Sequence, residues 1–324
     1  MARMKLGIDI GNCSVKVAET TGSGVTLHEI RMTENMMKDG EIAMPNSFSE
    51  FLRRELKARK AGRGKCALVL PARQVICRTV TMPRMPVDQL MLNLPYEFNE
   101  FVGSEPEKFF FDYAMCDPDE ADGEDRMTLV AAAAAKDRLT QYDRIVSDAR
   151  LKLKTVLPGE MALMNLVKRA GAPEGGEWCF VNLGQDAVGI TVIRGDRIQA
   201  TRQVEFGCGA IDQAIADLTN ADPFLAGTYK YNNFEGVLDT PECAEVYQRI
   251  AVEILKVVNF YRFNYRDSEL PGVYLIGGGA SIPQLRARIG DLLELPLLSM
   301  EELVPGMDPD EAARGALAIG AAAV

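Results

Sequence analysis

The chain has 324 residues, with 36 lysines and arginines against 46 aspartates and glutamates, a formal charge of −10 at pH 7. Its 47% hydrophobic and 25% charged content suits about two globular domains and excludes a disordered, collagen-like or coiled-coil protein. The acidic balance argues against a nucleic-acid-binding protein, because lysine and arginine carry the contacts to phosphates. The single histidine, His28, argues against a His-rich metal site or a Ser-His catalytic centre.

The cysteines and the apolar runs bear on the compartment. Seven cysteines are spread without a C-x-x-C pair, which is typical of neither a disulfide framework nor a zinc ribbon. The N-terminus lacks the apolar core of a secretory signal, and no apolar run reaches the roughly 18 residues of a membrane helix. We expect a cytoplasmic protein that reaches the inner face of the membrane only indirectly, through partners.

The first 82 residues read as a β-meander with one helix. Ser47, followed by Glu50 three residues later, predicts a capped helix with an apolar stripe. Alternating apolar residues predict strands at 5–10, 15–19, 25–31, 66–70 and 75–82.

From Pro83 the pattern changes, and we expect residues 83–157 to form an inserted subdomain. The acidic stretch 117–125 lacks the spacing of an EF-hand calcium loop and is interpreted as a solvated loop. The predicted elements of this block are a helix at 87–101 interrupted by Pro95, strands at 109–115 and 129–135, and a helix at 136–149.

The second half repeats the opening pattern after a helix at 158–170 and a linker at 171–176. The stretch 223–233 lacks periodicity and is expected to be a loop. The remaining predictions are strands at 179–183, 188–193, 197–204 and 273–276, and helices at 241–264, 283–293 and from about Asp308 to the end.

The repeat is the feature most informative about function. When residues 8–12 are placed over residues 181–185, Asp9 falls on Asn182 and Gly11 on Gly184. Each copy is an apolar strand, a polar residue, a glycine turn and a second strand; a P-loop or Rossmann turn would lead into a helix instead. Either turn alone is typical of an ordinary hairpin, but the recurrence predicts two similar lobes facing one another.

Such turns suit phosphate binding. A glycine after a strand lets successive backbone N–H groups point at an anion. Ser14 adds a hydroxyl and Lys16 a positive charge, although a strand lysine can also be a solvated one. Asp9 can organise a hydrated Mg²⁺, which normally keeps several of its waters. Cys13 is interpreted as a small filler beside the turn.

A third glycine cluster follows the strand at 273–276. Gly277, Gly278 and Gly279 let the backbone bend sharply and let a base or ribose lie against it. Ser281 is expected to cap the helix that begins at Pro283.

With these motifs the chain resembles the actin-like ATPase superfamily, which also contains Hsp70 and sugar kinases. Residues 7–19 match its first phosphate motif, 180–193 its second and 274–283 its adenosine motif, while 205–212 resembles the glycine-rich step after the second motif. Within the superfamily the chain is most similar to the PilM family of type IV pilus assembly. That likeness adds residues 98–113, 149–165, 255–261 and 275–285.

The resemblance implies an α/β, actin-like (ribonuclease H-like) two-lobed ATPase fold with an inserted subdomain of the FtsA type. The implied organisation is a first lobe at 1–82, the insert at 83–157, a return helix at 158–174, a second lobe at 175–304 with a helical subdomain at about 213–265, and a C-terminal helix at 305–324.

The resemblance also implies ATP and Mg²⁺ as cofactors, and as partners the N-terminal tail of a PilN-like inner-membrane protein, other pilus-assembly platform proteins and further copies of the chain. Asp9 would hold Mg²⁺ through water. The implied nucleotide-binding residues are Asp9, Gly11, Asn12, Cys13, Ser14, Lys16, Asn182, Gly184, Gln185, Gly207, Gly209, Glu253, Lys256, Gly277, Gly278 and Gly279.

One departure bears on catalysis, because the superfamily usually has an aspartate where this chain has Asn182. Gln185 or Asp186 can substitute only in part, so we expect ATP binding with weak or absent hydrolysis. Two other functions stay open. A sugar or acetate kinase on this fold needs a base, for which Asp186 and Asp212 are isolated candidates. An FtsA-like division filament needs an amphipathic membrane helix, which the alanine-rich tail at 308–324 does not resemble.

Overall fold

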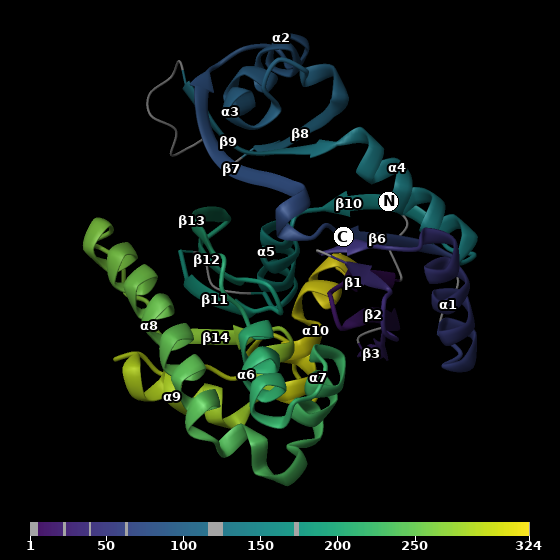
Figure 1. Cartoon of the computed structure of the whole chain (residues 1–324). Coiled ribbons are helices and arrows are strands. Elements are labelled where there is room, and N and C mark those ends of the chain that lie inside the picture. Colours follow the sequence, from purple (N-terminus) through teal and green to yellow (C-terminus); the bar gives the residue numbers. More distant parts are fainter. Residues whose placement is uncertain are drawn as a thin grey trace.

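The computed structural model describes residues 6–21, 24–38, 40–61, 64–115, 126–171 and 175–323. Two lobes, each built on its own β-sheet, face one another, and a smaller third sheet stands apart from them at the top of Figure 1. The acidic stretch at 117–125 lies outside the described residues.

The first lobe contains a five-stranded sheet in the order β10-β6-β1-β2-β3. One face of this sheet packs against α1 and α4 through apolar residues such as Ile8, Phe48 and Ile145. The short strands β4 (Met37–Lys38) and β5 (Glu41–Ile42) form a separate hairpin. The bounds are β1 Leu6–Ile10, β2 Ser14–Thr21, β3 Gly24–Arg31, β6 Lys65–Val69, β10 Lys152–Leu157, α1 Pro45–Ala58 and α4 Lys136–Asp148.

The insert is a three-stranded antiparallel sheet in the order β7-β9-β8, covered on one face by short helices. Its sheet begins at Val75, earlier than the expected boundary at residue 83, because β7 pairs along its whole length with β9. Its elements are η1 Ala72–Gln74, β7 Val75–Pro83, α2 Val87–Asn93, η2 Leu94–Phe98, α3 Asn99–Val102, η3 Pro106–Lys108, β8 Phe109–Met115 and β9 Arg126–Ala135.

The far boundary of the insert also differs from the expectation. Residues 136–157 form α4, which packs on α1, and β10, which pairs in parallel with β6. Both elements belong to the first lobe, and β10 is a strand that the sequence pattern did not predict. Its residues alternate only weakly between buried and exposed, since β10 lies at the edge of its sheet.

The second lobe repeats the hairpin of the first. β11 pairs antiparallel with β12 and parallel with β14, as β1 does with β2 and β6, which confirms the predicted duplication. The sheet order is β13-β12-β11-β14. The elements of this lobe are β11 Glu177–Leu183, β12 Val188–Arg194, β13 Arg197–Val204, α6 Gly209–Thr219, α7 Pro223–Asn232, η5 Phe234–Asp239, α8 Pro241–Asn264, β14 Val273–Ile276, η6 Gly278–Ser281, α9 Pro283–Leu292 and η7 Met300–Glu302.

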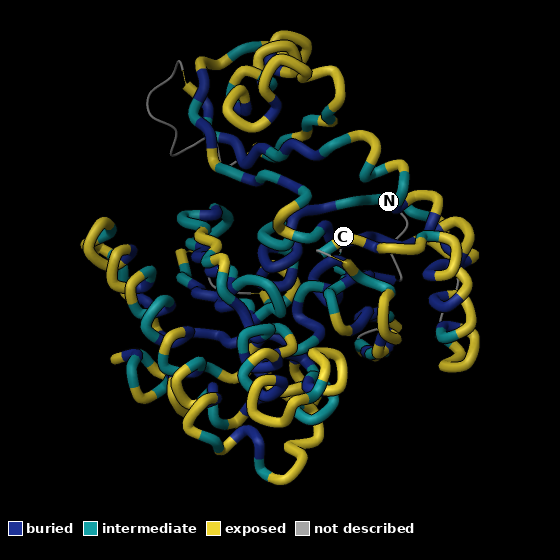
Figure 2. Tube along the Cα trace, in the orientation of Figure 1, coloured by how far each residue is buried: buried dark blue, intermediate teal, exposed yellow. Residues whose placement is uncertain are grey.

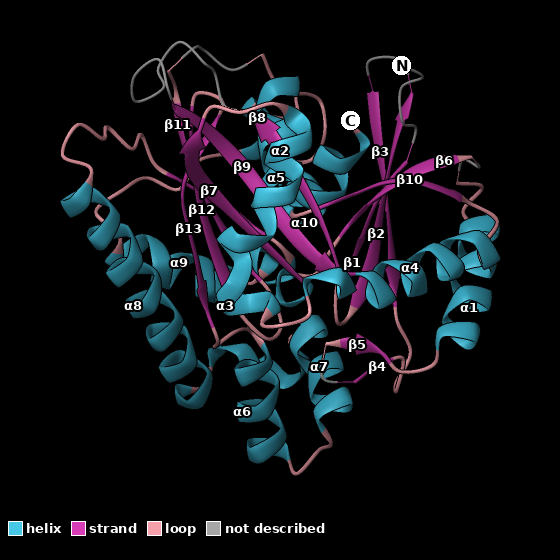
Figure 3. Cartoon of the chain, turned by 90° about the horizontal axis from the view of Figure 1, so that it is seen from above, coloured by secondary structure: helices cyan, strands magenta, loops and turns pink. Residues whose placement is uncertain are grey.

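Two helices, α5 (Gly159–Arg169) and α10 (Pro309–Ala322), lie between the two sheets (Figure 3). The two helices approach so closely that a Cβ on Gly320 of α10 would lie 1.9 Å from the carbonyl oxygen of Ala162 in α5. α10 lies equally close to β1, where a Cβ on Gly7 would lie 2.0 Å from the carbonyl oxygen of Ala318. Buried residues accordingly run through both sheets and along α10, while the outer helices keep exposed faces (Figure 2). The helix predicted from about Asp308 is therefore confirmed as α10, and it packs between the two sheets.

Three local predictions were wrong. α1 begins at Pro45 after Met44 without a side-chain cap, and α9 begins after Ile282, so neither Ser47 nor Ser281 is an N-cap. Residues 223–232 form α7 instead of a loop, because Asp222 accepts hydrogen bonds from the N–H groups of Phe224 and Leu225 (3.0 Å each). α6 had not been predicted at all.

Candidate functional site

A cavity of about 1480 Å³ lies between the two lobes and is lined by residues of both. The turns β1–β2 and β11–β12, the glycine turn after β14, the end of β3 and helix α7 all contribute to its wall. Cavities that hold small ligands and cofactors are commonly about 300–1,000 Å³. This one has room for a nucleotide and for water around it.

The two charged residues beside the first hairpin turn, Asp9 and Lys16, lie on the paired strands β1 and β2. Gly11 donates from its backbone N–H to Ser14 (3.1 Å), which closes the turn. Lys16 is buried and stands opposite Asp9 in the antiparallel register of β1 and β2. Burial raises the pKa of Asp9, and the positive charge of Lys16 partly counteracts that effect. Lys16 is thus a buried lysine and not a solvated one.

The second turn faces the first across the cavity. Asn12 donates from Nδ2 to Oδ2 of Asp186 (2.5 Å), which joins the two turns. A Cβ on Gly184 would lie 2.8 Å from the carbonyl oxygen of Ala187, so this turn requires glycine. Asn182 also lines the cavity, and its cross-strand neighbour is Gly189.

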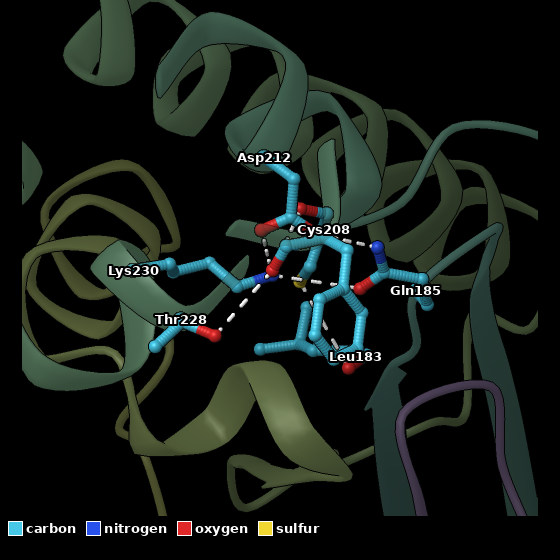
Figure 4. A network of polar contacts seen from close by, with 7 residues as sticks. Leu183, Gln185, Cys208, Asp212, Thr228 and Lys230 are labelled. Carbon is cyan, nitrogen blue, oxygen red and sulfur yellow. Dashed lines mark hydrogen bonds and ion pairs between the residues drawn. The ribbon is translucent and has the colours of Figure 1, made fainter. Parts of the chain in front are cut away.

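An ion pair between a buried aspartate and a half-buried lysine supports the second turn from behind (Figure 4). Lys230 of α7 lies 2.7 Å from Asp212 of α6, and Gln185 donates from Nε2 to the other carboxylate oxygen of Asp212 (2.5 Å). Lys230 also lies 3.5 Å from Oε1 of Gln185 and from the carbonyl oxygen of Cys208. Gln185 therefore holds the turn onto α6 and α7 and is not free to replace the missing aspartate.

Lys230 lines the cavity although no sequence motif predicts it there. Its nearest signal was Asp222-Pro223, a capping residue and a proline that start α7 and so bring Lys230 to the cavity wall.

The glycine turn after β14 closes the opposite end of the cavity. Gly277 has φ of +84°, and a Cβ on Gly279 would lie 2.4 Å from the Sγ of Cys208, so neither position accepts a side chain without strain. Beside it, Arg314 of α10 donates to Ser281 (3.2 Å) and to Glu29 of β3 (3.1 Å). This arginine links the glycine turn of the second lobe to the sheet of the first.

Two predicted pairs lie elsewhere. Gly207 and Gly209 do not line the cavity but pack beneath the second turn, where a Cβ on either would lie 2.5–3.0 Å from the carbonyl oxygen of Gln185. Glu253 and Lys256 form an ion pair with each other (2.7 Å) on the exposed side of α8, away from the cavity. They do not join the predicted residues that line the cavity, because the buried face of α8 packs towards the sheet.

The predicted residues that do line the cavity are Asp9, Gly11, Asn12, Cys13, Ser14, Lys16, Asn182, Gly184, Gln185, Gly277, Gly278 and Gly279. Desolvation raises the pKa of Cys13, which disfavours a thiolate nucleophile there.

The donor set fits a hydrated Mg²⁺ better than a caged metal. Within the described residues there is no group of three or more histidine, cysteine, aspartate or glutamate side chains placed to hold a metal ion. Mg²⁺ usually takes one or two carboxylates and completes its shell with water and substrate phosphates. Asp9 at the end of β1 and Asp186 in the β11–β12 turn both line the cavity and supply that much.

The comparisons with known proteins decide the family. The family model of the type IV pilus assembly protein PilM matches residues 7–308. The chain belongs to this family.

Solved structures confirm the actin-like fold of the chain. The structure titled PilM-PilN type IV pilus biogenesis complex is 21% identical, covers 99% of this chain and 98% of that one, and has a TM-score of 0.83. The ethanolamine utilization protein EutJ from Carboxydothermus hydrogenoformans is 18% identical, covers 99% and 91%, and has a TM-score of 0.60. No curated protein matches the chain. Within the described residues no helix has both the length and the apolarity to span a membrane.

Proposed function

We propose that this PilM-family chain binds ATP with Mg²⁺ in the cleft between its lobes and acts as an adaptor in type IV pilus assembly. The observation that carries the proposal is the pair of facing glycine turns, joined by Asn12 and Asp186, with the glycine turn after β14 at one end of the same cavity. Backbone N–H groups at such turns bind phosphates, and a glycine turn without side chains accepts a base or ribose.

Each part of the cleft would have its own role. The turns at Gly11 and Gly184 would cradle the phosphates, and Lys16 would offset their charge from inside the first sheet. Mg²⁺ would be held by the phosphates and, through water, by Asp9; when bound it would neutralise part of the phosphate charge. Lys230 would stabilise the second turn through Gln185.

A bound nucleotide would act by setting the angle between the two lobes. Contacts cross the cleft at Asn12 with Asp186 and at Arg314 with Glu29 and Ser281. A ligand shifts a conformational equilibrium only by its difference in affinity for the two states. ATP touching both turns would favour the closed arrangement.

The partner in this proposal is the N-terminal tail of a PilN-like inner-membrane protein. The solved complex similar to this chain along its whole length is titled PilM-PilN, and the chain would reach the membrane through such a partner from the cytoplasm. Other platform proteins and further copies of the chain remain expected partners of the same assembly.

Thermal unfolding with nucleotide tests the proposal. ATP with Mg²⁺ at about a hundred times its Kd adds about 2.7 kcal/mol to the free energy of unfolding. We expect a clear rise in Tm, a smaller one without Mg²⁺, and a further rise with a synthetic PilN tail. No rise with ATP would refute nucleotide binding, and phosphate transfer to an added sugar would favour the kinase instead.

A matched pair of lysine variants places the ligand. Lys16→Met should lower the affinity for ATP at least tenfold, because it removes the buried positive charge beside the first turn. Lys256→Met removes an exposed lysine away from the cavity and should leave the affinity unchanged. Isothermal titration calorimetry measures both, and equal effects of the two variants would contradict the assigned site.

A further inference from the structure

The second lobe presents its turns along one edge of its sheet in a fixed order. The glycine turn at Gly277 follows β14, the second phosphate turn joins β11 to β12, and Glu205 follows β13 directly. All three lie at the same edge, because Asn182 pairs with Ile276 and Val188 pairs with Val204. Neighbouring strands are about 4.8 Å apart, so about 14 Å separate the β14 end from the β13 end.

The strand ends of the first lobe face those of the second lobe in a corresponding order. Its sheet order places the end of β3 on one side of the β1–β2 turn and the end of β6 on the other. Arg31 at the end of β3 stacks on Tyr231 of α7 (3.8 Å), and Asn12 contacts Asp186 in the middle. Arg73, just beyond β6, contacts Glu205 at the far end. From the β14 side of the cleft to the β13 side, the order of features is therefore the glycine turn at Gly277, the two hairpin turns and Arg73.

Arg73 lines the cavity and is anchored by a residue that lies outside it. Its Nη2 donates to Glu205 (2.5 Å), and Gln203 donates to the other oxygen of Glu205 (2.7 Å). Arg73 lines the cavity, but Glu205 does not. The Nη1 of Arg73 lies 3.9 Å from Asp186, beyond hydrogen-bonding distance. Among the described residues, this nitrogen has no hydrogen-bond partner, so its donors remain available to an anion in the cavity.

We propose that Arg73 is a ligand of the terminal phosphate of a nucleoside triphosphate and is oriented by Glu205. The inference rests on the proposed function. A nucleoside at the Gly277 turn, with its first phosphates over the two hairpin turns, directs the third phosphate towards the β13 end, where Arg73 lies. A diphosphate ends before that point. The planar guanidinium can then donate to the carboxylate with one nitrogen and to the phosphate with the other.

The same residue connects the cleft to the insert. Arg73 lies in η1, and β7, which forms one edge of the insert sheet, begins two residues later at Val75. Thr79 of β7 donates to the carbonyl oxygen of Ile198 in β13 (3.0 Å). A terminal phosphate bound to Arg73 would therefore act on η1 and on the start of β7 at the base of the insert. A diphosphate would make no contact there.

Calorimetric titration of ATP and ADP, each with Mg²⁺, tests the assignment. Arg73→Ala should weaken ATP binding at least tenfold and ADP binding less than threefold. Glu205→Gln should weaken ATP binding about threefold, because Arg73 loses its charged anchor. The control is Arg54→Ala on the exposed side of α1, where Arg54 contacts its neighbour Glu55 and the ring of Phe51 and lies outside the cavity.

The outcomes separate the two proposals. If the wild-type chain binds neither nucleotide, the proposed function fails and this assignment fails with it. If the wild type binds ATP and Arg73→Ala loses ATP and ADP equally, or loses neither, only the role of Arg73 is overturned. Arg73→Lys, which keeps the charge but loses the fork, should fall between wild type and alanine; circular dichroism confirms that each variant is folded.

Discussion

The two hairpins of this chain share a topology but differ in where their charges lie. In the first, Lys16 stands opposite Asp9 within the β1–β2 ladder and is buried there. In the second, Asn182 stands opposite Gly189, and the charged pair Asp212 and Lys230 lies behind the turn on α6 and α7. The two copies share the backbone course of a turn that lines the cavity, while a charged cross-strand pair next to that turn is found in the first copy alone. Asn182 fits this difference, since an aspartate there would lack the lysine that Asp9 has.

The largest expected effect comes from breaking the charged pair behind the second turn. Lys230→Met leaves Asp212 buried with Gln185 as its remaining polar contact. Removing one partner of a buried pair typically lowers the free energy of unfolding by about 3–5 kcal/mol. Urea denaturation should show this loss.

The double variant Asp212→Asn with Lys230→Met is the control for that change. It removes both charges, so most of the stability should return. A double variant as unstable as Lys230→Met alone would mean that packing of the lysine stem, and not the unpaired carboxylate, causes the loss. In that case the second turn does not depend on a charge placed behind it.

A substitution that makes the second hairpin more like the first should be unfavourable. Asn182→Asp introduces a carboxylate without a lysine partner. The side chain of residue 182 packs directly against the backbone of Gly277, since a Cβ built on Gly277 would lie 2.3 Å from Oδ1 of Asn182. We expect the free energy of unfolding to fall by about 1–3 kcal/mol at pH 7, because a half-buried carboxylate loses water without gaining a cationic partner. The loss should shrink as the pH falls and the new carboxyl is protonated.

The counterpart in the first hairpin is Asp9→Asn. Burial raises the pKa of Asp9, so neutralising it should cost little stability or even add some. Its effect should appear instead as a weaker dependence of ATP binding on Mg²⁺, measured by titration with and without the metal. If both substitutions changed stability by the same amount, the electrostatic difference between the two hairpins would be refuted.

The sequence predicted the backbone features of the two hairpins better than it predicted where the charged side chains lie. The hairpins at Gly11 and Gly184, the turn at Gly277 and the long helix α8 were all readable, because apolar periodicity and glycine positions dictate them. Helix α7 was not, since Ala226 is its single buried residue among those described and its position depends on a cap and on Lys230.

Side-chain placement on a helix was the other limit. Glu253 and Lys256 have a plausible spacing for a ligand site, but the rotation of α8 decides which face meets the cleft. Seven residues of α8, including Ile250 and Ile254, are buried, and the acid and the lysine lie on the other side. That rotation is set by packing against α6, α9 and the sheet of the second lobe, which a single sequence does not display.

The smallest expected effect concerns Glu160 of α5, which lines the cavity beside the second sheet and accepts a hydrogen bond from Thr201 (3.3 Å). Burial raises the pKa of this carboxyl above its ordinary value of 4.5. An acid with a raised pKa in the folded state destabilises that state once the pH exceeds its value in the unfolded chain. Glu160→Gln keeps an acceptor for Thr201 and removes this cost, so it should raise the free energy of unfolding at pH 7 by on the order of 1 kcal/mol.

The gain from Glu160→Gln should be fully present above the raised pKa and should disappear as the pH falls below about 4.5. Thermal unfolding of both proteins across that range measures it. The comparison with Asp9 makes the result specific: both carboxyls line the cleft, but Asp9 has a lysine beside it and Glu160 has a threonine. A gain that persists unchanged at pH 4 would show that the amide side chain packs better for steric reasons, and that a carboxylate without a cationic partner carries no cost at the second sheet.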